Sequence, residues 1–220
     1  MPPVFIGHFA LGFAAKKVEP RLSLGVLLAA PQVLDLVWPL FVLAGVERVD
    51  VVPGDTAFTP LALVSMPWSH SLVMAVLWGA AFAALVPAAR RAPRAAAVVV
   101  ALVVSHWVLD WVSHRPDMPL WPGSPRFGLG LWNSVPGTLA VELALYAGGV
   151  WLYSRATRAR NRTGRLAFAW LVAFLFVVYF ANLLGPPPPS SRAVAVSALA
   201  LWLIPAWGAW IERHREPVGG

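Results

Sequence analysis

Long apolar segments separated by short polar connections constrain this chain more than any other feature. The segments fall at residues 4–15, 22–46, 61–88, 95–114, 134–154, 166–185 and 193–211. A helix needs about 20 residues to cross the hydrocarbon core of a bilayer. Six segments reach that length, and the first is short enough to be tilted, re-entrant or packed inside the others. We therefore predict an all-α, polytopic transmembrane helical bundle of six spanning helices plus a short N-terminal membrane segment.

The composition agrees with a membrane protein. Only 12% of the residues are charged and 59% are hydrophobic, whereas about a quarter of a soluble domain is charged. No polar stretch is long enough to bury a core of its own. Residues 1–220 are thus expected to form a single integral membrane domain, with C-terminal helices over 134–211.

The basic residues predict how the chain is oriented. Thirteen of the 17 lysines and arginines fall in alternate connections and at the C-terminal end. The positive-inside rule places these connections, and the C-terminus, in the cytoplasm. Because the arginines cluster in short loops between apolar segments, the net charge of +7 is read as a topology signal and not as nucleic-acid binding.

The connections on the opposite side are the more elaborate ones. Residues 115–133 are rich in Pro, Gly and Trp, which predicts an ordered, irregular interfacial cap without helix. Residues 47–60 are the other elaborate connection, and Pro186 to Pro189 form a stiff hinge between two helices.

A polar stripe interrupts the fourth apolar segment. His106, Asp110 and His114 are spaced four residues apart, so a helix places them on one face. Ionisable groups at the centre of a bilayer cost several kcal/mol and occur there with a partner, a metal or a functional role. The stripe is therefore the first candidate for a functional site.

Other embedded ionisable residues return to the same depth. With the predicted topology and a rise of about 1.5 Å per residue, Asp35, His70, His106, Asp110 and Glu142 lie between about 6 and 16 Å below the outer ends of their helices. His8 joins this layer if the N-terminus lies outside. Pro31 and Pro67 precede two of these residues, and each either frees backbone carbonyls near a site or only kinks a helix.

Structural explanations exist for each residue alone. A histidine on an apolar helix commonly hydrogen-bonds across a helix interface, and Glu142 reads as a neutral acid bonded to a neighbouring helix. His114 and Asp117 fit the rim of a site, as loop or turn residues. Taken together, three acids and four histidines without an intramembrane lysine or arginine require protons or a cation.

The residue types restrict the chemistry. The chain contains no cysteine, so any metal must be held by His, Asp and Glu. Imidazole with carboxylate suits a divalent metal, zinc first, with manganese or iron as alternatives. Asp35 and Glu142 are the candidate catalytic carboxylates. No Gly-rich phosphate loop, Gly-x-Ser-x-Gly elbow or His-Glu-x-x-His motif is present.

Five short elements in order carry a resemblance. They are Gly7-His8-Phe9-Ala10-Leu11-Gly12, Pro31-Gln32-Val33-Leu34-Asp35, Pro67-Trp68-Ser69-His70-Ser71-Leu72, Ser105-His106-Trp107-Val108-Leu109-Asp110 and Met118-Pro119-Leu120-Trp121-Pro122. Their order resembles a family of bacterial inner-membrane proteins described as metal-dependent hydrolases and as LexA-binding. The resemblance covers about residues 5–125. More remotely, the order His, Asp, His, His-x-x-x-Asp along the chain is similar to that of the zinc-dependent phospholipase C and P1 nuclease group.

The resemblance implies a location, a ligand set and an activity. It implies the bacterial inner (plasma) membrane, with a metal-site half at about 1–133. The implied metal ligands are His8, Asp35, His70, His106 and Asp110, with Glu142 a weaker candidate. Gln32 stands where the family pattern has an acid, and the His-Arg-Gly-x-Thr-His-Ser element survives only as Ser69-His70-Ser71. These departures favour one or two metal ions.

Three functions follow as hypotheses. The leading one is metal-dependent hydrolysis of a phosphoester in a lipid or lipid-linked substrate drawn from the membrane. The second is a transporter in which the same acids and histidines carry protons or bind a cation. The third is a non-catalytic membrane scaffold. Membrane lipids are the expected partners in each case, and no nucleic acid is expected.

Overall fold

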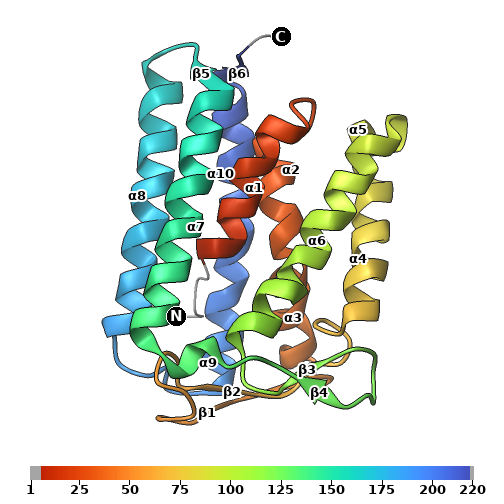
Figure 1. The fold of residues 1–220 in the computed structure, drawn as a ribbon, viewed down its shortest axis with the longest axis vertical. Coiled ribbons are helices and arrows are strands. Elements are labelled where there is room, and N and C mark those ends of the chain that lie inside the picture. The colour runs from red at the N-terminus through yellow and green to blue at the C-terminus, as the bar shows by residue number, and fades with distance from the viewer. Residues whose placement is uncertain (1–5, 219–220) are drawn as a thin grey trace.

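The protein is a bundle of helices with small strand pairs at its two ends. A computed structural model describes residues 6–218, and Figure 1 shows its helices standing side by side along the long axis. Five helical stretches are long and apolar enough to cross a membrane, namely Leu24–Leu43, Pro93–Ser113, Val135–Ala156, Arg162–Leu184 and Ser191–Glu212. The all-α membrane bundle predicted from the apolar segments is confirmed.

The helices and strands of residues 6–218 are as follows. The helices are α1 (Ile6–Val18), α2 (Leu24–Ala29), η1 (Ala30–Gln32), α3 (Val33–Leu43), α4 (Leu72–Leu85), α5 (Pro87–Arg91), α6 (Pro93–Ser113), η2 (Leu131–Asn133), α7 (Val135–Ala156), α8 (Arg162–Leu184), α9 (Ser191–Ala198), η3 (Leu199–Trp202) and α10 (Leu203–Glu212). The strands are β1 (Arg48–Val51), β2 (Leu61–Ser65), β3 (Met118–Pro119), β4 (Arg126–Phe127), β5 (Thr157–Ala159) and β6 (Arg215–Pro217).

The short first segment lies inside the bundle. Helix α1 packs along α7 and against α2 and α6, and Ile6, Phe9 and Phe13 have no exposed surface. Its first two predicted residues, 4 and 5, lie outside the described part of the chain. Of the three arrangements left open by the sequence, the packed one is observed, because most of α1 is buried between α7, α2 and α6.

The predicted spanning segment 61–88 is wrong. Residues Leu61–Ser65 form strand β2, paired antiparallel with β1, and the helix begins only at Leu72. Ser71 caps this helix by accepting a hydrogen bond from the backbone N–H of Met74. Pro67 lacks the N–H that a continuing helix would use. Helix α4 is therefore 14 residues long, so five helices and not six within residues 6–218 meet the length needed to span. His70 lies in the turn before the helix and not within it.

The two long connections form a cap at the lower end in Figure 1. Strands β1 and β2 pair there, and β3 pairs with β4 within the 115–133 connection. One 3₁₀ turn, η2, is the helical part of that connection. The 115–133 connection is ordered as expected, but the expectation of an irregular cap without helix is wrong, because the connection contains the pair β3–β4 and the 3₁₀ turn η2. Residues 186–189 join α8 to α9 as predicted.

A break in the first long helical stretch shapes the site. Pro31 lies in the 3₁₀ turn η1, between α2 and α3. The turn changes the hydrogen-bonding pattern of the backbone, and the carbonyl of Pro31 faces the side chain of His106 on α6. The interpretation that Pro31 frees a carbonyl near a site is supported by this contact.

Candidate metal centre

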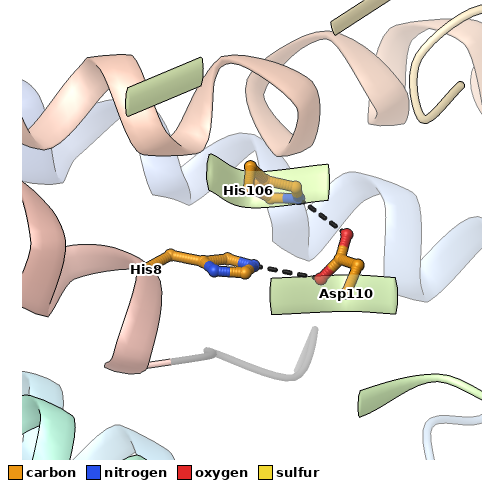
Figure 2. Close-up of side chains that lie close together, drawn as sticks. All are labelled: His8, His106 and Asp110. Atoms are coloured by element: carbon orange, nitrogen blue, oxygen red, sulfur yellow. Dashed lines mark hydrogen bonds and ion pairs between the residues drawn. The ribbon is translucent and has the colours of Figure 1, made fainter. Parts of the chain in front are cut away.

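Asp110 lies at the centre of the polar cluster. Its Oδ1 atom is 3.1 Å from His8 Nε2, and its Oδ2 atom is 3.0 Å from His106 Nε2. Figure 2 shows His8 reaching the carboxylate from α1, whereas His106 and Asp110 project from neighbouring turns of α6. All three residues are buried, with relative exposures of 1% for each histidine and 4% for Asp110.

Three more side chains complete the cluster. His70 Nε2 lies 3.4 Å from Asp35 Oδ1 and 3.9 Å from Asp110 Oδ2. His114 Nε2 lies 3.6 Å from Asp110 Oδ1. The structure thus brings together all five residues that the resemblance implied as ligands, and it adds His114, which was expected at the rim but is buried at the C-cap of α6.

The other ring nitrogens of these histidines have partners that fix the rings. His106 Nδ1 is 2.7 Å from the carbonyl oxygen of Pro31, which can only accept. His114 Nδ1 is 3.0 Å from Asp117 Oδ1. His70 Nδ1 is 2.6 Å from Ser69 Oγ, and that hydroxyl donates its hydrogen to Glu47 Oε2. From these partners we assign the proton of His70, His106 and His114 to Nδ1.

The assignment leaves each Nε2 atom facing a carboxylate. In the neutral ring, Nε2 carries a lone pair, and a lone pair repels a carboxylate oxygen. Positive charge placed between them, as protons or as a metal ion, removes the repulsion. Metal-bound histidines typically donate their second N–H to a carboxylate, a carbonyl or a similar acceptor, which is the pattern seen here.

Two overlapping sets of atoms are close enough to share an ion. They are His8 with His106 and Asp110, and Asp35 with His70 and His106, and within each set the ligand atoms lie within 4.8 Å of one another. Imidazole nitrogen and carboxylate oxygen are the donors that zinc and other divalent transition metals take. The residues therefore fit one or two divalent metal ions.

A small cavity adjoins the cluster. Its volume is about 50 Å³, enough for an ion with a few water molecules. We call it the inner cavity; it is lined by His8, Asp35, Trp38, Leu61, Leu63, Met66, His70, Asp110, His114, Trp132 and Leu201. None of these side chains is a lysine or an arginine, so the carboxylates are free of the basic neighbours that would compete with a metal.

Glu47 supports His70 and was not found from the sequence. It is 4% exposed, and its Oε1 atom accepts the backbone N–H groups of Trp68 and Ser69, each at 2.8 Å. With the Ser69 hydroxyl on Oε2, the carboxylate fixes the turn that carries His70. The sequence placed Glu47 in a loop, and no spacing pattern linked it to residues 22 positions away.

Removal of this support is expected to weaken metal binding without removing a ligand. We predict that Ser69→Ala lowers metal affinity by about 10- to 100-fold, the range for outer-shell partners of metal-binding histidines. Isothermal titration of the purified protein with zinc measures the change. Ser154→Ala is the matched control, because Ser154 bonds only the carbonyl of Val150. Equal affinities for both variants would show that the Glu47–Ser69 contact does not position His70.

A second chain of polar contacts supports His114. Arg115 pairs with Asp55 and lies 3.5 Å from Asp117, so it holds Asp117 against the ring. Burial disfavours the charged form of His114, but the carboxylates of Asp110 and Asp117 outweigh this and raise its pKa. Asp117, predicted at the rim, is 8% exposed and contacts the cluster only through His114.

Glu142 lies behind α1 and does not line the inner cavity. It has no exposed surface, and its Oε2 atom accepts the backbone N–H of Gly7 at 2.8 Å. A carboxylate at the first turn of a helix is favourably placed for the exposed N–H groups. Its observed contact is with the residue before His8, which fits the interpretation of Glu142 as an acid bonded to a neighbouring helix.

The fold and this cluster define an integral membrane protein with a buried His/Asp centre. The chain belongs to the YdjM inner membrane protein family, whose model matches residues 61–184. The match includes His70, His106, Asp110, His114 and Glu142, and it extends past residue 125, where the resemblance seen in the sequence ended. The family description names an inner membrane protein and no activity. Comparison with curated proteins and with solved structures finds no match.

Proposed function

We propose that the protein is a metal-dependent hydrolase of the inner membrane that cleaves a phosphoester in a lipid or lipid-linked substrate. One observation carries the proposal: four Nε2 atoms converge on the carboxylates of Asp35 and Asp110, while three of the Nδ1 atoms are held from behind. Neutral imidazoles of His70, His106 and His114 would point lone pairs at anionic oxygens, so positive charge is needed between them, and a divalent metal ion would supply it.

His8, His70, His106, Asp35 and Asp110 would hold the metal, and His114 is close enough to join them. Zinc is the first choice for this donor set, with manganese and iron as alternatives. When bound, such an ion supplies positive charge next to a phosphoryl oxygen and makes water more acidic.

Asp35 has the geometry for proton transfer. Its side chain is 24% exposed, compared with 5% for Asp110, and it lines the inner cavity. One oxygen faces His70 and His106, which leaves the other to accept a proton from water. In hydrolysis, the water oxygen bonds to phosphorus, the ester P–O bond breaks, and the alcohol leaves with a proton. Glu142, which contacts Gly7, would hold α1 and thereby His8.

The orientation of the chain is part of the proposal. The positive-inside pattern puts the cap and the inner cavity on the non-cytoplasmic side and the C-terminus in the cytoplasm. The substrate would then come from the outer leaflet.

Metal analysis and a lipid assay test the proposal together. The purified full chain is expected to contain about one or two equivalents of zinc, manganese or iron per protein. It is expected to release diacylglycerol or phosphatidic acid from phosphatidylglycerol in mixed micelles. Chelation should lower the rate by at least about 100-fold, because charge stabilisation worth several kcal/mol is lost, and the returned metal should restore it.

Two results would overturn the proposal. Folded protein that binds no divalent metal would favour the scaffold. Metal-free, pH-dependent uptake into liposomes would favour the transporter.

A further inference from the structure

A groove follows the outer surface of the bundle between α7 and α8. Figure 1 shows the two helices side by side at one edge of the bundle, and the Tyr146 hydroxyl joins them by donating to the carbonyl oxygen of Val172. The groove has a volume of about 530 Å³, which falls within the roughly 300–1,000 Å³ of pockets that hold organic molecules. We call it the side groove; its lining includes Tyr146, Val150 and Ser154 on α7 and, on α8, residues of one face from Arg165 to Val177.

Most of the side groove is apolar. The two hydroxyl groups on its α7 side already have partners, because Tyr146 donates to Val172 and Ser154 donates to the carbonyl oxygen of Val150. Neither Asp nor Glu is among the lining residues. The remaining surface of α8, from Phe168 onward, consists of aliphatic and aromatic side chains. An apolar chain is therefore the ligand that suits the length of the groove.

The length of the side groove matches one leaflet of a bilayer. With a rise of about 1.5 Å per residue, the stretch from Arg165 to Val177 is about 18 Å long. The hydrocarbon core of a bilayer is about 30 Å thick, so the chains of one leaflet fill about 15 Å of it. An acyl chain that lies along the groove would thus extend over most of its length.

Two arginines lie at one end of the side groove. Arg165 is an exposed residue in the first turn of α8, and Arg215 comes from β6. Nη1 of Arg215 donates to the carbonyl oxygen of Gly164, the residue before Arg165. Both arginines line the groove, and within residues 6–218 neither forms an ion pair with a carboxylate.

The acidic residues of the C-terminal segment are already paired. Glu216 forms ion pairs with Arg158 and Arg160, and Glu212 forms one with Lys16. Their negative charge is therefore shared with other basic side chains. The arginine end of the side groove keeps an excess of positive charge.

Arg215 shows this excess most clearly, because its charge is buried. The residue is 8% exposed, and its guanidinium donates only to neutral oxygens, those of Thr157 and Gly164. It also lies 5.4 Å from the ring centroid of Tyr153 and 4.9 Å from that of Phe168. Aromatic faces and neutral oxygens compensate part of a buried charge, whereas buried charges are commonly paired with an opposite charge. A phosphate group would supply it, and guanidinium groups suit phosphate oxygens.

We infer that the side groove binds an anionic phospholipid, with an acyl chain between α7 and α8 and the phosphate beside Arg165 and Arg215. Basic pockets between transmembrane helices bind anionic lipid headgroups in this way. The arginine end lies with β5 and β6, at the end of the bundle opposite the cap (Figure 1). The inference therefore goes beyond the proposed function and involves none of the metal ligands.

Retention of defined lipids tests the inference. Dioleoyl phosphatidylglycerol and dioleoyl phosphatidylcholine are presented at equal concentration to the purified full chain in detergent, and the retained lipid is counted by native mass spectrometry. We expect phosphatidylglycerol to be retained about tenfold or more over phosphatidylcholine. Arg165→Gln should lower this preference about fivefold, which corresponds to about 1 kcal/mol for one basic residue near an anionic surface.

Arg90→Gln is the matched control for the charge. Arg90 is an exposed arginine of α5, at the same end of the bundle (Figure 1), and it does not line the side groove. Ala169→Phe tests the apolar part, because Ala169 is exposed and lines the groove, so the added ring would occupy the space of an acyl chain. Ala101→Phe is its control, at an exposed position of α6 outside the groove. Only Arg165→Gln and Ala169→Phe should lose the preference.

Four results would overturn the inference. Equal retention of the two lipids would mean that the groove holds ordinary bilayer lipid. An equal loss in Arg165→Gln and Arg90→Gln would mean that general surface charge attracts the lipid. Retention of glycerophosphoglycerol, the headgroup without its chains, as strong as that of phosphatidylglycerol would mean that the arginines bind a soluble anion. Loss of the preference in Asp110→Asn would mean that the lipid is held at the metal centre. A preference that persists in Asp110→Asn would support the side groove whether or not the protein is a hydrolase.

Discussion

Asp110→Asn is expected to abolish metal binding while the protein remains folded. Both oxygens of Asp110 face histidine nitrogens, with His8 and His114 on Oδ1 and His106 and His70 on Oδ2. The amide keeps the shape of the side chain but removes its negative charge, on which the binding of a divalent cation depends. Because loss of an outer-shell partner alone costs about 10- to 100-fold, we expect affinity to fall by more than about 100-fold. Metal analysis after dialysis, with zinc titration, measures it.

Asp50→Asn is the control for this substitution. Asp50 lies on strand β1 at the surface and pairs with Arg48, so the same change there should leave metal content unaltered. Circular dichroism and thermal unfolding would show that both variants keep the helical fold. If Asp110→Asn binds metal as tightly as Asp50→Asn, Asp110 does not hold the metal ion.

The parts of the fold that follow from hydrophobicity were predictable. Helices α6, α7 and α8 coincide with apolar segments to within a few residues, because a lipid environment requires continuous backbone hydrogen bonding. The 61–88 segment shows the limit of that principle. Strand β2 and helix α4 are both apolar. In the sequence, the boundary between them is marked by Pro67 and by the cap residue Ser71. Hydropathy alone does not distinguish an apolar strand from an apolar helix.

The centre was predictable where it depended on helical spacing. His106 and Asp110 are four residues apart on one helix, and the structure brings them together as expected. Glu47 was not predictable, because its partners Ser69 and Trp68 meet it only through the packing of two loops. His114 was assigned to the rim because it ends its apolar segment, between Ser113 and Arg115. Its burial depends on Trp132, whose ring lies 4.1 Å from the imidazole and comes from a distant turn.

The position of α1 controls whether His8 reaches the centre. Helix α1 approaches α7 closely at Gly149, where a Cβ atom would lie 2.3 Å from the carbonyl oxygen of Ala10 and 2.7 Å from its Cα atom. These are backbone atoms, so they cannot move aside without shifting the helix. Ala10 is two residues from His8, and a displaced α1 would carry the imidazole away from Asp110.

Gly149→Ala is therefore expected to reduce both stability and metal affinity. Overpacking of this kind costs about 1–3 kcal/mol, which corresponds to a fall in the apparent Tm of roughly 2–12 °C for a chain of this size. Thermal unfolding in detergent measures the first effect, and zinc titration measures the second.

Gly148→Ala is the matched control, because a Cβ atom at Gly148 meets nothing within 4 Å. The added methyl group raises helix propensity by about 0.5–1 kcal/mol, so this neighbour should be neutral or more stable and should bind metal normally. If Gly149→Ala unfolds at a lower temperature but retains normal zinc affinity, His8 is not required in the metal centre. If both alanines behave alike, the close contact between α1 and α7 does not limit the fold. Loss of zinc binding in Gly149→Ala but not in Gly148→Ala would show that the position of α1 determines metal binding. Gly149 packs against Ala10 of α1 and is not one of the proposed ligands.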